Sequence, residues 1–406
     1  MRASTYPLVD AAEAAALVLA RTPVLDSEPV HVREALGRVL AEDLVAPSEL
    51  PRFPSSAVDG YAIRSADGGG RLRVAGESAA GRPFEGRLEA GLAARILTGG
   101  VLPEGADTVV MVEDTDQEEG YVTVPAGHPA GRNFHRPGAD LKQGELVLER
   151  GEELGPAEIG LAAALGFPTL TVHRRPRVAL MSTGDELVEV GEQLGPGQIV
   201  DSNRWALLAA LREAGAEVRV LGLAPDRPEP LRELVVEALG GADALVTSGG
   251  VSVGSHDLVK PLLEALGEVH IGRVKLRPGK PFTFATLPEG RLAFGLPGFP
   301  VSSLVTFEVF VRPALRRMQG HARLQRPRLP VRLAYEARAA GDRTEYQRVT
   351  LRREGQELVA QTTGSQSSSR LMSLVGADAL VRVSPGAEGI PAGSVVEAII
   401  LRLPGE

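Results

Sequence analysis

The spacing of apolar residues changes along the chain, and each change predicts a different structure. Over residues 5–45 apolar positions recur at helical spacing, interrupted by Pro23, so we expect helix there. Short runs such as RLRVAG, ARILTGG and YVTVPAG follow between Gly and Pro, which predicts a β-rich unit. Helical spacing returns around GPAEIGLAAALG. We therefore predict a discontinuous helical domain, 1–45 plus 138–174, with a β-rich domain, 46–137, inserted into it.

Apolar strands alternate with amphipathic helices through residues 175–322. RVALMSTG, EVRVLGLA, DALVTSGG and RLAFGLPG have the character of strands, and DSNRWALLAALREAG has that of a helix with polar residues at its start and Gly215 at its end. This alternation with short loops predicts a parallel sheet covered on both faces, a three-layer α/β/α domain. Runs such as VRLAYEA and VVEAIILRL predict a small C-terminal β domain over 323–406. The fold class expected is thus α/β multidomain.

Composition and charge narrow the function classes. The content of 43% hydrophobic and 24% charged residues is typical of a globular protein. No apolar stretch approaches the ~20 residues of a membrane span, and the N-terminal run resembles an amphipathic helix rather than a secretory signal. The absence of cysteine excludes disulfides and thiolate metal sites and fits a reducing, cytoplasmic setting. A net charge of −8 makes nucleic acid an improbable partner, and the seven His lack zinc-ligand spacing.

Three loops that leave strand ends are rich in glycine and hydroxyl side chains: STGDEL at 182–187, TSGGVSVGSHD at 247–257 and GLPGFPVSS at 295–303. Ligands of open parallel sheets lie beyond the carboxyl ends of the strands, where glycine lets backbone N–H groups approach an anion. A tight strand-to-helix turn favours the same residues, but three such loops on one sheet favour an anion site. None fits the Walker or dinucleotide-binding pattern. The candidate binding residues are Thr183, Gly184, Ser248, Gly249, Gly250, Ser252, Gly254, Pro297, Gly298 and Ser302.

Acidic residues accompany these loops. Glu186, Asp226 and Asp257 follow strand ends, and each alone could be a helix cap or a solvated loop acid. Together beside an anion site they would repel the ligand unless a divalent cation lay between, and Mg²⁺ prefers such oxygen ligands. In KLRPGKPF the rigid turn would hold Lys280 in a fixed place for an oxyanion, with a charged surface turn as the alternative.

Seven motifs follow one another in an order that carries a resemblance to a known family. They are PSSAVDGYAIR, ILTGGVLPEGADTVVMVED, GRNFHRPGAD, STGDELVEVGEQLGPGQIVDSN, TSGGVSVGSHD, RPGKPFTF and GLPGFPVSS. The series resembles that of the MoeA-type molybdopterin molybdenumtransferases, which include the gephyrin E domain, and it thins only in the last eighty or so residues. The resemblance implies Mg²⁺-dependent insertion of molybdate into adenylylated molybdopterin with release of AMP. It also implies an elongated homodimer of four-domain subunits with a MogA-like central domain.

The resemblance assigns roles to single residues. The functional acids and the threonine of the family match six positions here, which we take as catalytic: Asp59, Thr98, Asp140, Glu186, Asp226 and Asp257. Glu186, Asp226 and Asp257 are the expected metal ligands, and Asp59 is expected to act across the cleft, in its own subunit or from the other. The resemblance adds Lys280, Arg348 and Ser368 to the substrate-binding residues.

Four positions depart from the family pattern. Arg277 stands where lysine is expected, Gly100 where alanine is expected, and His135 where arginine is common. Phe299 replaces an asparagine and removes a polar side chain, so it is left out of the binding residues.

Three rival functions stay open: a molybdopterin adenylyltransferase that uses ATP, a non-catalytic gephyrin-like scaffold, and a tungstate-inserting relative. Transient contacts with a molybdopterin adenylyltransferase and with molybdoenzyme maturation factors are further expectations, and neither nucleic acid nor membrane is expected as a partner.

Overall fold

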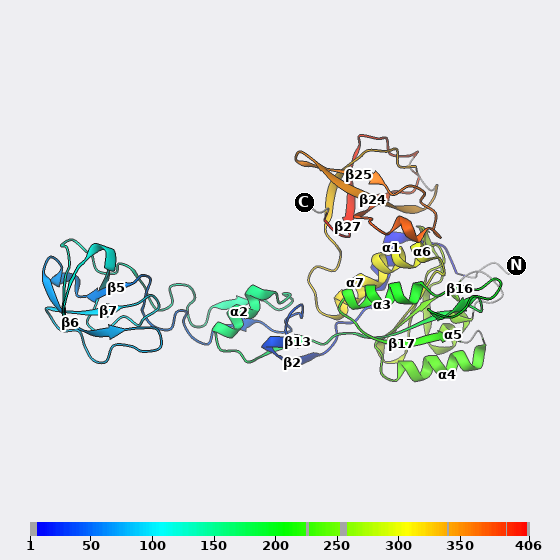
Figure 1. The fold of residues 1–406 in the computed structure, drawn as a ribbon. Coiled ribbons are helices and arrows are strands. Elements are labelled where there is room, and N and C mark those ends of the chain that lie inside the picture. The colour runs from blue at the N-terminus through cyan, green and yellow to red at the C-terminus, as the bar shows by residue number, and fades with distance from the viewer. Residues whose placement is uncertain (1–5, 225–226, 252–257, 339–340, 387, 404–406) are drawn as a thin grey trace.

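The computed structural model describes residues 6–224, 227–251, 258–338, 341–386 and 388–403. The chain is elongated (Figure 1). A β-sheet unit lies at one end, a small unit with helix α2 (Pro156–Ala164) lies in the middle, and an α/β domain with an adjoining C-terminal sheet lies at the other end. Among the described residues, no helix is long and apolar enough to cross a membrane.

The α/β domain is built on a six-stranded sheet. Four parallel strands lie side by side in the order β17 (Glu217–Ala224), β14 (Arg177–Thr183), β18 (Ala244–Ser248) and β22 (Leu292–Leu296). Two antiparallel strands, β21 (Thr283–Thr286) and β19 (Glu268–Ile271), extend the sheet beyond β22. The predicted fold class is confirmed. The sequence pattern missed β19 and β21, because strands of four residues are too short to show a period.

The two faces of this sheet are both covered, as the apolar runs predicted. In β14 the side chains of Val178 and Leu180 join one core cluster, whereas those of Ala179 and Met181 join the other. The first face packs against α3 (Asn203–Glu213), α6 (Pro300–Thr306) and α7 (Arg312–Met318); the second packs against α4 (Pro228–Leu239) and α5 (Val259–Leu266). A π-helical turn, η5 (Phe307–Val311), joins α6 to α7.

The N-terminal segment differs from the prediction. Helix α1 covers only Ala11–Arg21, and strands β2 (Ser27–His31) and β3 (Leu44–Val45) follow, so the helix expected over 5–45 is wrong beyond Arg21. The alternation of exposed and half-buried side chains in SEPVH suits a strand, and β2 pairs with β13 (Thr169–His173). The buried side chains of α1 pack into the core of the α/β domain. The domain boundaries drawn from the sequence stay a prediction.

The remaining parts of the chain are mostly β-structure. The sheet at the far end has the order β8-β5-β7-β6-β10-β9, with β8 (Thr108–Met111), β5 (Gly60–Ile63), β7 (Leu92–Ile96), β6 (Arg71–Ser78), β10 (Tyr121–Thr123) and β9 (Asp116–Glu118). Short pairs connect this sheet with the middle unit, namely β4 (Ser55–Ser56) with β11 (Phe134–His135) and β3 with β12 (Leu146–Leu148). Single 3₁₀ turns lie at Val32–Glu34, Ser65–Asp67, Val112–Asp114, Pro288–Gly290 and Leu371–Ser373.

The C-terminal sheet continues into the α/β domain. Its own strands are β23 (Arg328–Leu333), β24 (Thr344–Glu354), β25 (Glu357–Thr362), β26 (Ala379–Val383) and β27 (Val395–Ile400). Strand β20 (Val274–Arg277) pairs with β24, with Leu276 opposite Thr344 and Arg277 opposite Glu345, and β1 (Val9–Asp10) pairs with β20. Backbone hydrogen bonds therefore fix the C-terminal domain against the α/β domain.

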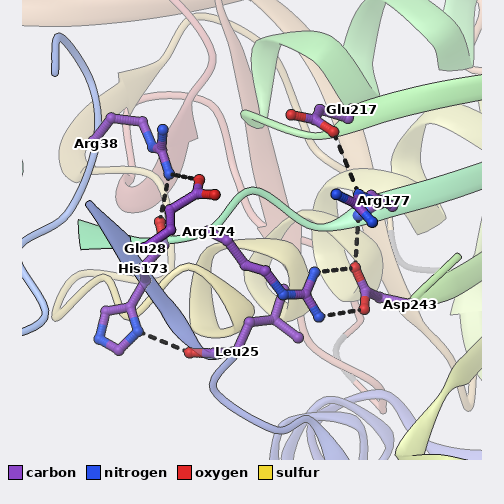
Figure 2. A network of polar contacts seen from close by, with 8 residues as sticks. All are labelled: Leu25, Glu28, Arg38, His173, Arg174, Arg177, Glu217 and Asp243. Carbon is purple, nitrogen blue, oxygen red and sulfur yellow. Dashed lines mark hydrogen bonds and ion pairs between the residues drawn. The ribbon is translucent and has the colours of Figure 1, made fainter. Parts of the chain in front are cut away.

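A polar network holds the connection between β13 and β14 (Figure 2). The guanidinium of Arg174 donates two hydrogen bonds of 2.7 Å to the carboxylate of Asp243, which lies just before β18. On the side of the middle unit, Arg38 donates to the carboxylate of Glu28 and to the carbonyl of His173. The network ties the middle unit to the α/β domain at one joint.

Candidate functional site

A cavity of about 1150 Å³ lies at the carboxyl edge of the parallel strands. The loops after β14, β18 and β22 line it with Thr183–Leu187, Ser248–Val251 and Pro297–Pro300. The turn after β20 and a serine-rich loop of the C-terminal domain complete the wall. The described parts of the three loops singled out in the sequence therefore meet in one cavity, as the rule for open parallel sheets predicts.

Glycine is required where two of these loops touch. Gly249 and Gly250 have φ of +87° and +68°, a region that side chains rarely adopt. A Cβ on Gly249 would lie 2.5 Å from the carbonyl oxygen of Thr183, and one on Gly250 would lie 2.5 Å from Val259 Cγ2. The chain can approach the end of β14 this closely only without side chains.

Asn203 connects two of the loops, a role that the sequence did not predict. Its Nδ2 donates to the hydroxyl of Ser248 at 2.9 Å and to the carbonyl of Gly298 at 2.6 Å. The polar run before α3 predicted a helix cap, yet Ser202 at the cap position makes no side-chain capping bond. The spatial neighbours of Asn203 lie 45 and 95 residues away in sequence, so no local signal could have revealed this role.

Basic side chains line another part of the cavity. Lys280 is exposed, and its carbonyl accepts hydrogen bonds from the N–H groups of Val274 and Phe282, which holds the PGKP turn in place. Arg277 lines the cavity, and its Nε lies 3.7 Å from the buried carboxylate of Glu345. Burial raises the pKa of Glu345, and the nearby Arg277 opposes that rise. This wall presents positive charge to an anion.

The serine-rich loop, Gln366–Ser369, comes from the C-terminal domain. Ser368 lines the cavity, and its carbonyl accepts a hydrogen bond from the N–H of Val301 in α6. The side chain of Arg348 lies behind the loop, where it donates to the carbonyl of Ser367 at 3.2 Å and to the hydroxyl of Ser373 at 3.1 Å. Arg348 is fully buried, and this burial lowers its pKa to about 10. Arg348 is not among the residues that line the cavity, so its predicted part in substrate binding stays a prediction.

The candidate metal ligands are only partly described. Glu186 and Asp185 are exposed and line the cavity, and the Glu186 carboxylate lies over Gly184, where a Cβ would be 2.6 Å from Oε2. Asp226 and Asp257, like Ser252 and Gly254, lie outside the described residues. Within the described ranges, no three His, Asp or Glu side chains form a metal cluster. The Mg²⁺ site stays a prediction.

Three of the predicted catalytic residues lie away from the cavity. Asp59 directly precedes β5 and Thr98 follows β7, both in the sheet at the opposite end of the chain (Figure 1). The N–H and the hydroxyl of Thr98 each donate to Asp59 Oδ1 at 2.7 Å, and these two bonds lower the pKa of the exposed carboxyl. Asp140 is exposed in the connection between β11 and β12. One chain alone does not bring these residues to the cavity.

The other predicted binding residues line the cavity. Thr183, Gly184, Pro297, Gly298 and the buried Ser302 all contribute to its wall. All the predicted loop residues that lie in the described ranges therefore line one cavity, together with Lys280 and Ser368.

Comparison with known proteins covers almost the whole chain. Residues 9–166 match the MoeA N-terminal region (domain I and II), residues 179–317 match a probable molybdopterin binding domain, and residues 330–401 match the MoeA C-terminal region (domain IV). A curated molybdopterin molybdenumtransferase of Haemophilus influenzae is 38% identical over 91% of this chain and 93% of its own length. A gephyrin of Dictyostelium discoideum is 36% identical over 98% of this chain, which spans 63% of that protein. A crystal structure of a molybdopterin biosynthesis MoeA protein from Pyrococcus horikoshii has a TM-score of 0.84 and 33% identity, and the match covers 98% of this chain and all of that one.

Proposed function

The chain belongs to the MoeA family of molybdopterin molybdenumtransferases, and on this premise we propose that its cavity binds adenylylated molybdopterin and molybdate and releases AMP. The carrying observation is the convergence of three strand-end loops, the PGKP turn and the serine-rich loop on one cavity of about 1150 Å³. A volume of that order has room for a nucleotide-sized ligand, since pockets for single small molecules occupy roughly 300–1,000 Å³.

The walls of the cavity suggest a division of binding roles. The loop around Gly249 and Gly250 would receive phosphate oxygens, because its backbone can approach them without hindrance. Lys280 and Arg277 would receive molybdate, together with the hydroxyl of Ser368. The positive wall offsets the overall negative charge of the protein at the place where an anionic substrate must bind.

Mg²⁺ is part of the proposal. Glu186 presents an exposed carboxylate to the cavity, which suits a cation that prefers oxygen ligands. Glu186, Asp226 and Asp257 would hold the ion. When bound, it would neutralise charge on the phosphate groups between pterin and adenosine.

The position of Asp59 supports a homodimer. Its carboxyl is exposed, has a lowered pKa and is held by Thr98, so it is charged and oriented although it lies far from the cavity of its own chain. We propose that the sheet unit of one subunit borders the cavity of the other and brings Asp59 and Thr98 to it.

Mixed dimers test this arrangement. D59N and K280A subunits are each expected to be inactive alone. If Asp59 acts across the dimer, a random mixture regains about a quarter of wild-type activity, because half of the dimers are mixed and each mixed dimer has one intact site. A mixture as inactive as its parents would place Asp59 in its own subunit's site or outside the reaction.

The proposed reaction has a direct assay. Purified protein is given adenylylated molybdopterin, molybdate and Mg²⁺, and AMP release and molybdenum incorporation are measured. K280A should lose most activity, whereas K275A, a change on β20 at a lysine that does not line the cavity, should retain it. Equal activity of wild type and K280A would contradict the site.

The same assay with other substrates distinguishes the rival functions. Consumption of ATP with unmodified molybdopterin would instead indicate an adenylyltransferase. Failure of any turnover despite ligand binding would favour a scaffold, and preference for tungstate in competition would identify the oxyanion. The lack of cysteine fits the proposed cytoplasmic setting. There an adenylyltransferase would supply the substrate and maturation factors would receive the product.

A further inference from the structure

Phe299 occupies an unusual position on the cavity wall. Its side chain is 59% exposed, although it is a large apolar ring, and it belongs to the cavity lining. Pro300 follows it. The backbone of Phe299 has the extended conformation that a residue before proline prefers, with φ of −76° and ψ of 132°. With Pro297 two residues before it, the loop holds the base of the ring in a fixed place.

A second apolar element lines the same cavity. Strands β15 (Leu187–Val188) and β16 (Ile199–Val200) form a short parallel ribbon. Ile199 and Val200 are 56% and 37% exposed, and both belong to the cavity lining. This part of the wall contrasts with the glycine loops, the serine-rich loop and the basic wall.

The ribbon is anchored rather than loose. The N–H of Ile199 donates to the carbonyl of Glu186 at 2.8 Å, and the N–H of Asp201 donates to that of Val188 at 3.0 Å. The buried guanidinium of Arg204 in α3 pairs with Glu189 just after β15. The apolar side chains of the ribbon are therefore presented to the cavity by a fixed backbone.

We infer that Phe299, together with Ile199 and Val200, forms the ring-binding part of the cavity and stacks on a planar heteroaromatic ring of the pterin nucleotide. The inference rests on the proposed function, which supplies a ligand with two such rings and a chain of phosphates between them. Phosphate groups form no favourable contact with exposed apolar side chains, whereas stacking on an aromatic face stabilises the binding of a flat ring. Phe299 thus contacts the substrate directly and orients its ring.

The test measures binding of ligands with and without a ring. Wild type and F299A are titrated calorimetrically with AMP, with a phosphate-free pterin and with inorganic pyrophosphate. Loss of base stacking on an aromatic ring weakens binding by about 5- to 150-fold, so F299A should lose that much for AMP or for the pterin. The ring whose affinity falls identifies which half of the substrate the residue contacts. Affinity for pyrophosphate should stay within about twofold, since that ligand has no ring to stack.

Two further variants sharpen the result. F299W should retain ring binding, because tryptophan offers a larger aromatic face. L194A removes an apolar side chain of similar exposure, 57%, in the same domain but not on the cavity wall, and should leave all three affinities unchanged.

Several outcomes would overturn the inference. Equal weakening of AMP, pterin and pyrophosphate by F299A would mean that Phe299 only shapes the loop. Unchanged affinity for both ring ligands would remove the stacking role, and a changed oligomeric state in light scattering with unchanged affinities would assign Phe299 to a subunit contact. If wild type bound none of the three ligands, the proposed function itself would fail at the nucleotide site, whereas the first two outcomes leave that function standing.

Discussion

The ion pair at the joint between the middle unit and the α/β domain allows a direct test of how much its hydrogen bonds contribute to stability. Asp243 accepts two hydrogen bonds of 2.7 Å from Arg174 and a third of 2.8 Å from the backbone N–H of Arg177 (Figure 2). The two side chains are only 17% and 27% exposed. D243N keeps the shape of the side chain but replaces one acceptor with an NH₂ group that faces a donor of the guanidinium or of the backbone.

The expected loss follows from the number and charge of these bonds. A hydrogen bond to a charged group contributes about 1.5–3 kcal/mol, and partial solvent access lets water satisfy some of what is lost. We therefore expect D243N to lower the free energy of unfolding of the α/β domain by about 2–3 kcal/mol at pH 7. Trp205 in α3 is the single tryptophan of the chain, so its fluorescence in a urea titration reports on this domain.

The same network contains a matched control. Glu217 lies 3.7 Å from Arg177, and these side chains are 60% and 65% exposed. A surface pair of this kind contributes about 0–1 kcal/mol, so E217Q should stay within about 0.5 kcal/mol of wild type. A loss below about 0.5 kcal/mol in D243N, or equal losses in the two variants, would refute the reasoning.

The pH dependence supplies a second check on Asp243. Burial acts to raise the pKa of this carboxyl, but the hydrogen bonds from Arg174 and from the Arg177 N–H outweigh it and lower the pKa. The stabilisation is therefore present above the unfolded pKa of about 4 and is lost as the pH falls through the lower folded value. The gap in stability between wild type and D243N should close below pH 4 or so. A gap that stayed constant would show that the charge is not its source.

Three further predictions concern other parts of the chain. Burial, and next the nearby Arg316, lower the pKa of His321 to about 4, so between pH 6.5 and 4 the unfolded chain binds a proton that the folded chain does not. In urea titrations the wild type should therefore lose about 3 kcal/mol of stability as the pH falls across this range, and H321Q should not show this pH dependence. G250A places a Cβ 2.5 Å from Val259 at a residue whose backbone is left-handed. This change should lower stability by about 2 kcal/mol and abolish the binding of pyrophosphate measured by calorimetry. G241A, whose Cβ would have no atom within 4 Å, should do neither. R348M removes the donors that hold Ser367 and Ser373, and should raise the KM for molybdate while lowering stability by about 3 kcal/mol; an unchanged KM would separate Arg348 from the cavity.

The local pattern of apolar and polar residues was sufficient to predict most helices and strands of the α/β domain. The strands around Leu180 and Val246 and the helices between them were predicted from sequence, because each is long enough to show its own period of burial. The glycine loops were predicted for a related reason: positive φ at Gly249 and Gly250 demands glycine whatever surrounds it. The rule that ligands lie at the carboxyl ends of parallel strands then located the cavity.

Relations between distant segments could not be obtained in this way. The packing of α1 on the α/β core, the brace formed by Asn203, the burial of Arg348 and the exposure of Phe299 in the cavity all depend on which surfaces meet. Departure from the family pattern left Phe299 out of the binding residues, because chain position alone gives no information on what an aromatic ring faces. Periodicity and backbone conformation are properties of neighbouring residues, whereas burial and side-chain contacts arise only when segments far apart in the chain pack together.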